Sequence, residues 1–124
     1  MSNVSILVAD DFAPWRLQLR DMLRRPEWHI AEASDGVEAV KKATELRPDV
    51  VLLDIGMPLL NGIETAEKIR EATPGSRIIF VTQDGDADVK AAALATGAKG
   101  YISKATAAGE LLPAIEAVIR EHQC

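Results

Sequence analysis

The chain has 124 residues, of which 48% are hydrophobic and 27% charged, a composition typical of one folded domain. This composition excludes a disordered chain, and apolar runs such as Val50–Leu53 are far too short to cross a bilayer. The formal net charge of −5 argues against direct binding of nucleic acid by this chain. The one cysteine, Cys124, permits neither an intramolecular disulfide nor a cysteine metal cluster. Because no signal-peptide core precedes Asp10, we expect a cytoplasmic protein without a membrane partner.

Five short apolar segments alternate with segments of helical periodicity. The strands are expected at Ser5–Ala9, His29–Ala33, Val50–Leu53, Arg77–Thr82 and Gly100–Ser103. The five helices are marked by apolar faces: Trp15, Leu19, Met22 and Leu23; Val40, Ala43 and Leu46; Ile63, Ala66 and Ile69; Val89, Ala92, Ala93 and Thr96; and Leu111, Leu112, Ile115, Val118 and Ile119. This alternation predicts a parallel sheet with helices on both faces.

Several residues mark where the helices begin and end. Asp35, followed three residues later by Glu38, resembles a capping box at the start of the second helix. Gly97 is placed to end the fourth helix. Pro113 would disturb the interior of a helix. We therefore expect the last helix to begin near residues 109–110 or to bend there.

The strands differ in a way that predicts their order. Val50–Leu53 and Ile78–Val81 are continuously apolar, as central strands covered on both faces must be. His29–Ala33 alternates, as expected for an edge strand. These patterns agree with the order 2-1-3-4-5. We predict an α/β fold of three layers (α/β/α), a doubly wound, five-stranded parallel sheet of the flavodoxin-like class, in one domain over residues 1–124.

Polar residues follow the strands at their carboxyl ends, where such sheets bind ligands. Asp10 and Asp11 follow the first strand, Asp54 the third and Lys104 the fifth, and Thr82 closes the fourth. Two carboxylates ~4 Å apart repel by roughly 1 kcal/mol in water and by about 4 kcal/mol at an effective dielectric of ~20. One lysine cannot balance three acids, so the pattern predicts a hard divalent cation such as Mg²⁺. Such a site suits phosphoryl transfer to a carboxylate.

Each of these residues alone also has a structural explanation, as a helix cap, a turn former, a strand-end hydroxyl or a surface charge. Their joint placement at four strand ends favours function. The motifs are Val8-Ala9-Asp10-Asp11, Leu52–Pro58 with Asn61-Gly62, Val81-Thr82 and Gly97–Lys104. With them, the sequence resembles the receiver domain of two-component response regulators along essentially its whole length.

The resemblance implies the roles of the site residues. Asp54 would be the phosphoacceptor. Asp11, Asp54 and the backbone carbonyl of Gly56 would hold Mg²⁺, with Asp10 contributing directly or through water. Lys104 would pair with the phosphoryl group. The chain would thus be no enzyme in its own right but an acceptor that assists its own Mg²⁺-dependent phosphorylation and dephosphorylation.

The resemblance also implies a switch and its partners. Thr82 would hydrogen-bond the phosphoryl group, and the Tyr101 ring would fill the space that Thr82 leaves. The face made by the fourth helix, fifth strand and fifth helix would repack. The partners would be a sensor histidine kinase or phosphotransfer protein and, on phosphorylation, a second copy in a homodimer. The pattern at Gly100-Tyr101 and Glu110–Leu112 is most similar to receivers that precede a LuxR-type helix-turn-helix domain in transcription regulators; no such domain lies in these 124 residues.

The sequence departs from the family pattern at a few positions. Ala105 stands where many receivers have proline after the lysine, so the peptide bond is expected to be trans. Gln83 replaces a smaller residue and would partly shield the site. Gly56 and Asp84 occupy positions that set how fast water removes the phosphoryl group, and their net effect has no predicted sign.

Three alternatives differ in the residues they need. A haloacid dehalogenase-type hydrolase would have Asp-x-Asp after the first strand, where this chain has adjacent acids. A flavodoxin-like FMN carrier would have a phosphate loop rich in Ser, Thr and Gly, unlike Asp11–Pro14. A phosphorylation-independent interaction module with the same fold stays open, because Gln83 and Ala105 depart from the family pattern.

Overall fold

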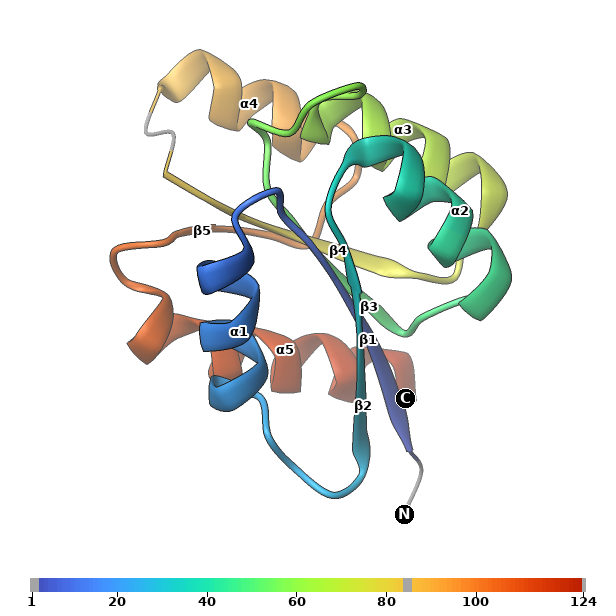
Figure 1. The fold of residues 1–124 in the computed structure, drawn as a ribbon, viewed down its shortest axis with the longest axis vertical. Helices are drawn as coiled ribbons and strands as arrows, with labels where there is room; N and C mark the ends of the chain where they lie inside the picture. Colours follow the sequence, from blue (N-terminus) through green and yellow to red (C-terminus); the bar gives the residue numbers. More distant parts are fainter. Residues whose placement is uncertain (1–2, 84–85, 124) are drawn as a thin grey trace.

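A parallel sheet of five strands forms the centre of the computed structural model, which describes residues 3–83 and 86–123 (Figure 1). Asp84 and Cys124 lie outside the described residues. The strands are β1 (Val4–Ala9), β2 (Trp28–Ala33), β3 (Val50–Leu53), β4 (Arg77–Thr82) and β5 (Gly100–Ser103). Their order, β2-β1-β3-β4-β5, confirms the prediction, and β1 and β2 each begin one residue earlier than expected.

Helices cover both faces of the sheet, as predicted (Figure 1). They are α1 (Ala13–Met22), α2 (Gly36–Leu46), α3 (Gly62–Ala72), α4 (Ala87–Ala95) and α5 (Ala107–Gln123). One face packs against α1 and α5 and the other against α2, α3 and α4. Within the described residues, no helix combines the length and the apolar character needed to cross a membrane.

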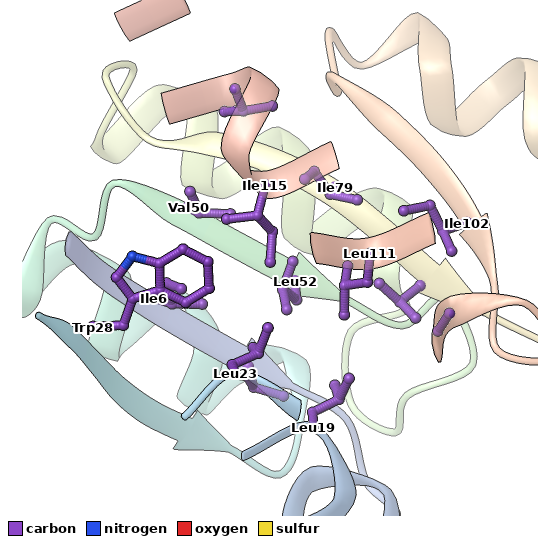
Figure 2. Packing of buried hydrophobic residues seen from close by; sticks show 14 of the residues in the cluster. Ile6, Leu19, Leu23, Trp28, Val50, Leu52, Ile79, Ile102, Leu111 and Ile115 are labelled. Carbon is purple, nitrogen blue, oxygen red and sulfur yellow. The ribbon is translucent and has the colours of Figure 1, made fainter. Parts of the chain in front are cut away.

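The continuously apolar β3 supplies side chains to two separate cores. Val50 and Leu52 belong to the cluster beneath α1 and α5, whereas Val51 and Leu53 belong to the cluster on the opposite face. Successive side chains of a strand point to opposite faces, so a strand covered on both sides must be apolar at every position. Figure 2 shows the first cluster, in which β1 and β3 meet side chains from α1 and α5.

The capping box predicted at α2 is only half formed. The Asp35 side chain accepts a hydrogen bond from the Glu38 amide at 2.7 Å, as expected. The Glu38 carboxylate, however, accepts from the amide of Ser34 at 2.6 Å, one residue outside the cap. A complete capping box starts α3 instead, where Asn61 and Glu64 each accept from the other's backbone amide at 2.9 and 3.4 Å.

For the last helix, the late start near residues 109–110 is wrong, and the alternative of a bend there stays a prediction. Helix α5 begins at Ala107 and contains Pro113 in its interior. Its first turn is closed by the Thr106 carbonyl, which accepts from the amides of Gly109 and Glu110 at 3.1 Å each. The buried side chain of Ala107 packs in the α1/α5 core, so tertiary packing holds this turn although proline removes one hydrogen bond further along.

The end of α4 agrees with the sequence pattern, whereas two residues of α2 and α4 do not. Gly97 follows the C-cap of α4 with φ +94°, a conformation that favours glycine, which confirms its predicted role. Leu46 and Ala92, which were expected on apolar faces, are exposed. Leu46, the last residue of α2, and Ala92 of α4 are therefore not covered by other described parts of the chain.

Candidate functional site

The carboxyl ends of the strands carry the predicted polar residues to one rim. Asp54 continues the ladder between β3 and β1, because its amide donates to the carbonyl of Ala9 at 3.0 Å. Lys104 likewise continues the ladder between β5 and β4, because its amide donates to the carbonyl of Thr82 at 3.0 Å. Parallel pairing in register therefore brings segments distant in the chain to the same edge.

Three carboxylates meet at this rim, as the sequence predicted. Asp10, Asp11 and Asp54 each offer an oxygen, and these oxygens lie within 4.8 Å of one another. Asp10 and Asp54 are buried, with 2% and 8% of their surface exposed, whereas Asp11 is exposed. The three carboxylates are thus buried on the side of Asp10 and Asp54 and open to solvent on the side of Asp11.

Lys104 provides one positive charge for this acidic group. Its Nζ lies 2.7 Å from Oδ2 of Asp10 and 3.6 Å from Oδ2 of Asp54. The lysine side chain is only 12% exposed, so the ion pairs are largely shielded from water. One ammonium still leaves an excess of negative charge when all three carboxylates are ionised.

The surroundings of Asp10 are unfavourable for its charged form. Burial raises the pKa of its carboxyl, and the negative charge of Asp54 adds to the rise. The hydrogen bonds from Lys104 and from the amide of Phe12 oppose these effects, but the pKa stays above its usual value. A further positive charge at this rim would therefore be stabilising.

The donor set fits a hard divalent cation. Oδ1 of Asp10 accepts from the Phe12 amide at 2.8 Å. The buried Oδ2 has, beyond its ion pair with Lys104, no hydrogen-bond partner in the described parts of the chain, so it keeps lone pairs to offer. Carboxylate oxygens are the ligands that Mg²⁺ prefers, and the exposed Asp11 leaves an open side for waters.

The loop after β3 places Asp54 and Gly56 at the open side. Oδ1 of Asp54 accepts from the amide of Ile55 at 2.8 Å. The carbonyl of Ile55 accepts from the amides of Met57 and Gly62, at 3.0 and 2.8 Å, which closes the loop onto the start of α3. Gly56 is exposed, and a Cβ there would meet no atom within 4 Å. Its role as a carbonyl ligand stays a prediction.

The two predicted switch residues lie on neighbouring strands. Thr82 is 2% exposed at the end of β4. Tyr101 of β5 is half-buried against the α2–α3–α4 core, with its ring 6.4 Å from that of Phe80 at an angle of 43°. The Nζ of Lys90, on α4, lies 5.8 Å from the Tyr101 ring centroid. The tyrosine thus touches the α4 side, and its movement on phosphorylation stays a prediction.

The positions where the sequence departs from the family pattern are also visible. Gln83 and Ala105 are both exposed beside the site. Among the described residues no peptide bond is cis, so the bond between Lys104 and Ala105 is trans, as expected.

Sequence reasoning missed two contributors from α1. The Trp15 ring lies 5.4 Å from Nζ of Lys104. Arg16 donates through Nη1 to the carbonyl of Asp10 at 2.6 Å and through Nε to Glu32 at 2.9 Å. The helical spacing placed Trp15 on a core face, and the residue does pack against the α1/α5 core. Only its closeness in sequence to the acidic pair could also have indicated a role at the site.

Comparison with known proteins identifies the family. The model of the response regulator receiver domain matches residues 6–116, so the chain belongs to that family and is a receiver domain of two-component systems. The chain is 38% identical to the chemotaxis protein CheY of Thermotoga maritima, over 80% of this chain and 83% of that protein.

Solved structures agree with this assignment. A LuxR-family two-component response regulator from Aurantimonas superposes with a TM-score of 0.89 at 34% identity, over 97% of this chain and 87% of that one. CheY in the CheX–CheY–BeF₃–Mg²⁺ complex from Borrelia burgdorferi is similar with a TM-score of 0.88 at 29% identity, over 95% and 90% of the two chains. The predicted fold class and family are therefore confirmed.

Proposed function

We propose that the chain is a phosphoacceptor in which Asp54 takes a phosphoryl group from the phosphohistidine of a sensor kinase or phosphotransfer protein. An oxygen of Asp54 would attack phosphorus while the phosphorus–nitrogen bond breaks, and the histidine nitrogen keeps the electron pair of that bond. The observation that carries the proposal is the convergence of three carboxylates, whose oxygens lie within 4.8 Å of one another, with the Lys104 ammonium 2.7 and 3.6 Å from two of them.

The proposal assigns the metal to the same residues. Asp10, Asp11, Asp54 and the carbonyl of Gly56 would hold Mg²⁺, which when bound neutralises phosphoryl oxygens. The BeF₃ and Mg²⁺ bound in the Borrelia complex support this role by relationship. The chain's own contribution is to hold Asp54 at the rim: its amide donates to the Ala9 carbonyl, and its Oδ1 accepts from the Ile55 amide.

Lys104 would stay with the phosphoryl group after transfer. The aspartyl phosphate carries about two negative charges and three strong acceptor oxygens in place of one carboxylate charge. The ammonium of Lys104, 3.6 Å from Oδ2 of Asp54, would pair with the new charge, and the hydroxyl of Thr82, a buried residue that ends β4 at the same edge of the sheet, would hydrogen-bond the phosphoryl group.

The output would be a change at the α4–β5–α5 face. Movement of Thr82 toward the phosphoryl group would vacate space that Tyr101 can fill, and Tyr101 in turn contacts Phe80 and Lys90. This repacked face would mediate a phosphorylation-dependent homodimer. We propose a role in cytoplasmic signalling and, in a longer protein of the LuxR-family type, in transcription regulation; the chain itself would turn over no external substrate.

Intact-mass measurement tests the proposal. Incubation with Mg²⁺ and acetyl phosphate or phosphoramidate should add one phosphoryl group to the chain. The adduct should be lost in Asp54→Asn and when Mg²⁺ is omitted. Asp21→Asn is the matched control, because Asp21 is an exposed acid on α1 paired only with Arg24 among the described residues. No adduct with either donor would refute the proposal and favour the phosphorylation-independent interaction module.

A further inference from the structure

Lys104 has a second partner besides the carboxylates. Its Nζ lies 5.4 Å from the centroid of the Trp15 ring, within the ~6 Å over which a cation is attracted to an aromatic face. Trp15 also packs close to Asp10 and Asp54, around a gap between α1 and the sheet that is too small to hold a water molecule. The indole therefore lies beside the buried side of the acidic group, although it belongs to a different element from the acids.

The first turn of α1 is fixed relative to the acidic group. The Trp15 amide donates to the carbonyl of Phe12 at 3.0 Å, and the Phe12 amide donates to Oδ1 of Asp10 at 2.8 Å. Arg16 ties the same turn to the carbonyl of Asp10 and to Glu32 of β2, and its side chain is only 16% exposed. The ring therefore has a defined position from which to act on Lys104.

The carboxylate that holds Lys104 is also one that the metal would use. Oδ2 of Asp10 lies 2.7 Å from Nζ of Lys104, and Asp10 belongs to the group that could bind a divalent cation. A cation among these acids offsets the attraction of Asp10 for the ammonium and adds repulsion of its own. The Trp15 ring is neutral and is no metal ligand, so its attraction for the ammonium is not shared with the cation.

We propose that Trp15 is a positioning residue for Lys104, whose ring keeps the ammonium beside Asp54 when Asp10 is committed to the cation. This inference rests on the proposed function, because the ammonium is useful there only if Asp54 receives a phosphoryl group. The pairing with Trp15 differs from the other two described cation–aromatic contacts, of Arg25 and Lys90, in that its cation also pairs with the site carboxylates.

A double-mutant cycle tests the action through Lys104. Trp15→Leu removes the aromatic face but keeps an apolar side chain, and should slow phosphorylation by acetyl phosphate about fivefold. Trp15→Phe should recover most of that rate, because it restores a ring. In a Lys104→Met background, Trp15→Leu should cause no further loss. An unchanged rate in Trp15→Leu, or an equal slowing with and without Lys104, would overturn the proposal.

Tryptophan emission gives a readout that needs no phosphorylation. The chain has two tryptophans, and Trp28 lies at the start of β2, away from the carboxyl ends, so Trp28→Phe isolates the emission of Trp15. In that background, Lys104→Met should raise the Trp15 emission by removing a quenching ammonium from the ring. Adding Mg²⁺ to the Lys104 protein should leave the emission low. The proposal would be overturned if Mg²⁺ raised the Trp15 emission to the level of the Lys104→Met variant, or if Lys104→Met left the emission unchanged.

The two experiments separate this proposal from the proposed function. Wild-type chain that forms the adduct while Trp15→Leu forms it equally fast refutes the positioning role alone. Wild-type chain that forms no adduct refutes the phosphoacceptor function, and the positioning role then fails with it whatever the emission shows. Thermal unfolding of each variant shows that it is folded, and Trp28→Phe, which lies outside the site, is the control that should keep the wild-type rate.

Discussion

The start of α3 is pressed against the strand end that carries Asp54, and this contact makes Gly62→Ala an informative perturbation. A Cβ at Gly62 would lie 2.1 Å from the Asp54 carbonyl oxygen and 2.6 Å from Cα of Ile55. Both are backbone atoms, which cannot rotate away as a side chain could. Either the helix or the end of β3 must move, so we expect Gly62→Ala to lower stability and to disturb the site together.

The expected loss can be estimated from overpacking. Forcing an extra methyl group into a packed site costs about 1–3 kcal/mol, and the backbone contacts at Gly62 favour the upper end. Alanine regains up to about 1 kcal/mol over glycine in a helix. The net loss is about 2 kcal/mol, which for a domain of this size lowers Tm by about 8 °C.

Urea unfolding measures this loss, with Gly109→Ala as the matched control. Gly109 also lies in a helix, but a Cβ there meets no atom within 4 Å, so alanine should stabilise the chain by about 0.5–1 kcal/mol. The Gly62→Ala midpoint should fall with an unchanged m-value, and phosphorylation of Asp54 should slow. A Gly62→Ala variant within about 0.5 kcal/mol of the wild type would refute the reasoning.

Three further predictions concern charge and capping. Lys104→Met should tighten Mg²⁺ binding about tenfold at low salt, because it removes a positive charge that lies 2.7 Å from a carboxylate of the acidic group. A calorimetric titration measures this affinity, and weaker binding would contradict the proposed metal site. Glu32→Gln should cost about 1 kcal/mol at pH 7. Hydrogen bonds from Arg20 and Arg16 lower the pKa of the Glu32 carboxyl in the folded protein. The stabilisation is therefore present above the usual glutamate pKa and is lost as the pH falls through the lowered pKa of Glu32. Urea unfolding from pH 7 down to about pH 3 checks this, and a difference that persists at the acid end would contradict it. Asn61→Ala should cost about 1 kcal/mol by removing the reciprocal cap of α3, whereas Asn61→Asp should retain most of it in the same assay; equal losses in the two variants would show that the cap contributes little.

The strands and their order could be predicted from the sequence because their signals are local. The run Val50–Leu53 is apolar at every position, and His29–Ala33 alternates, so burial on two faces or on one could be inferred from periodicity alone. The fold class then followed from the alternation with helical segments. The same strand ends carried Asp10, Asp54 and Lys104 to one rim, because parallel strands in register share their carboxyl edge.

Side-chain pairing across elements could not be predicted in this way. The Glu38 carboxylate bonds to Ser34 rather than completing the expected box, because a competing amide lies within its reach. Helix α5 begins at Ala107 in spite of Pro113, because burial in the α1/α5 core outweighs one missing hydrogen bond. Such outcomes depend on which groups are close in space, and periodicity carries no information on that.

The sequence by itself determined the chemistry available to this protein: three acids, a hydroxyl and a lysine at the ends of the strands, in the pattern of a receiver domain. Only the tertiary structure decided which groups surround the Lys104 ammonium: Oδ2 of Asp10 at 2.7 Å, Oδ2 of Asp54 at 3.6 Å and the ring of Trp15 at 5.4 Å. The physical reason is that residue types and spacing follow from local order along the chain, whereas the partners of a buried charge follow from the packing of α1 against the sheet that contains β5.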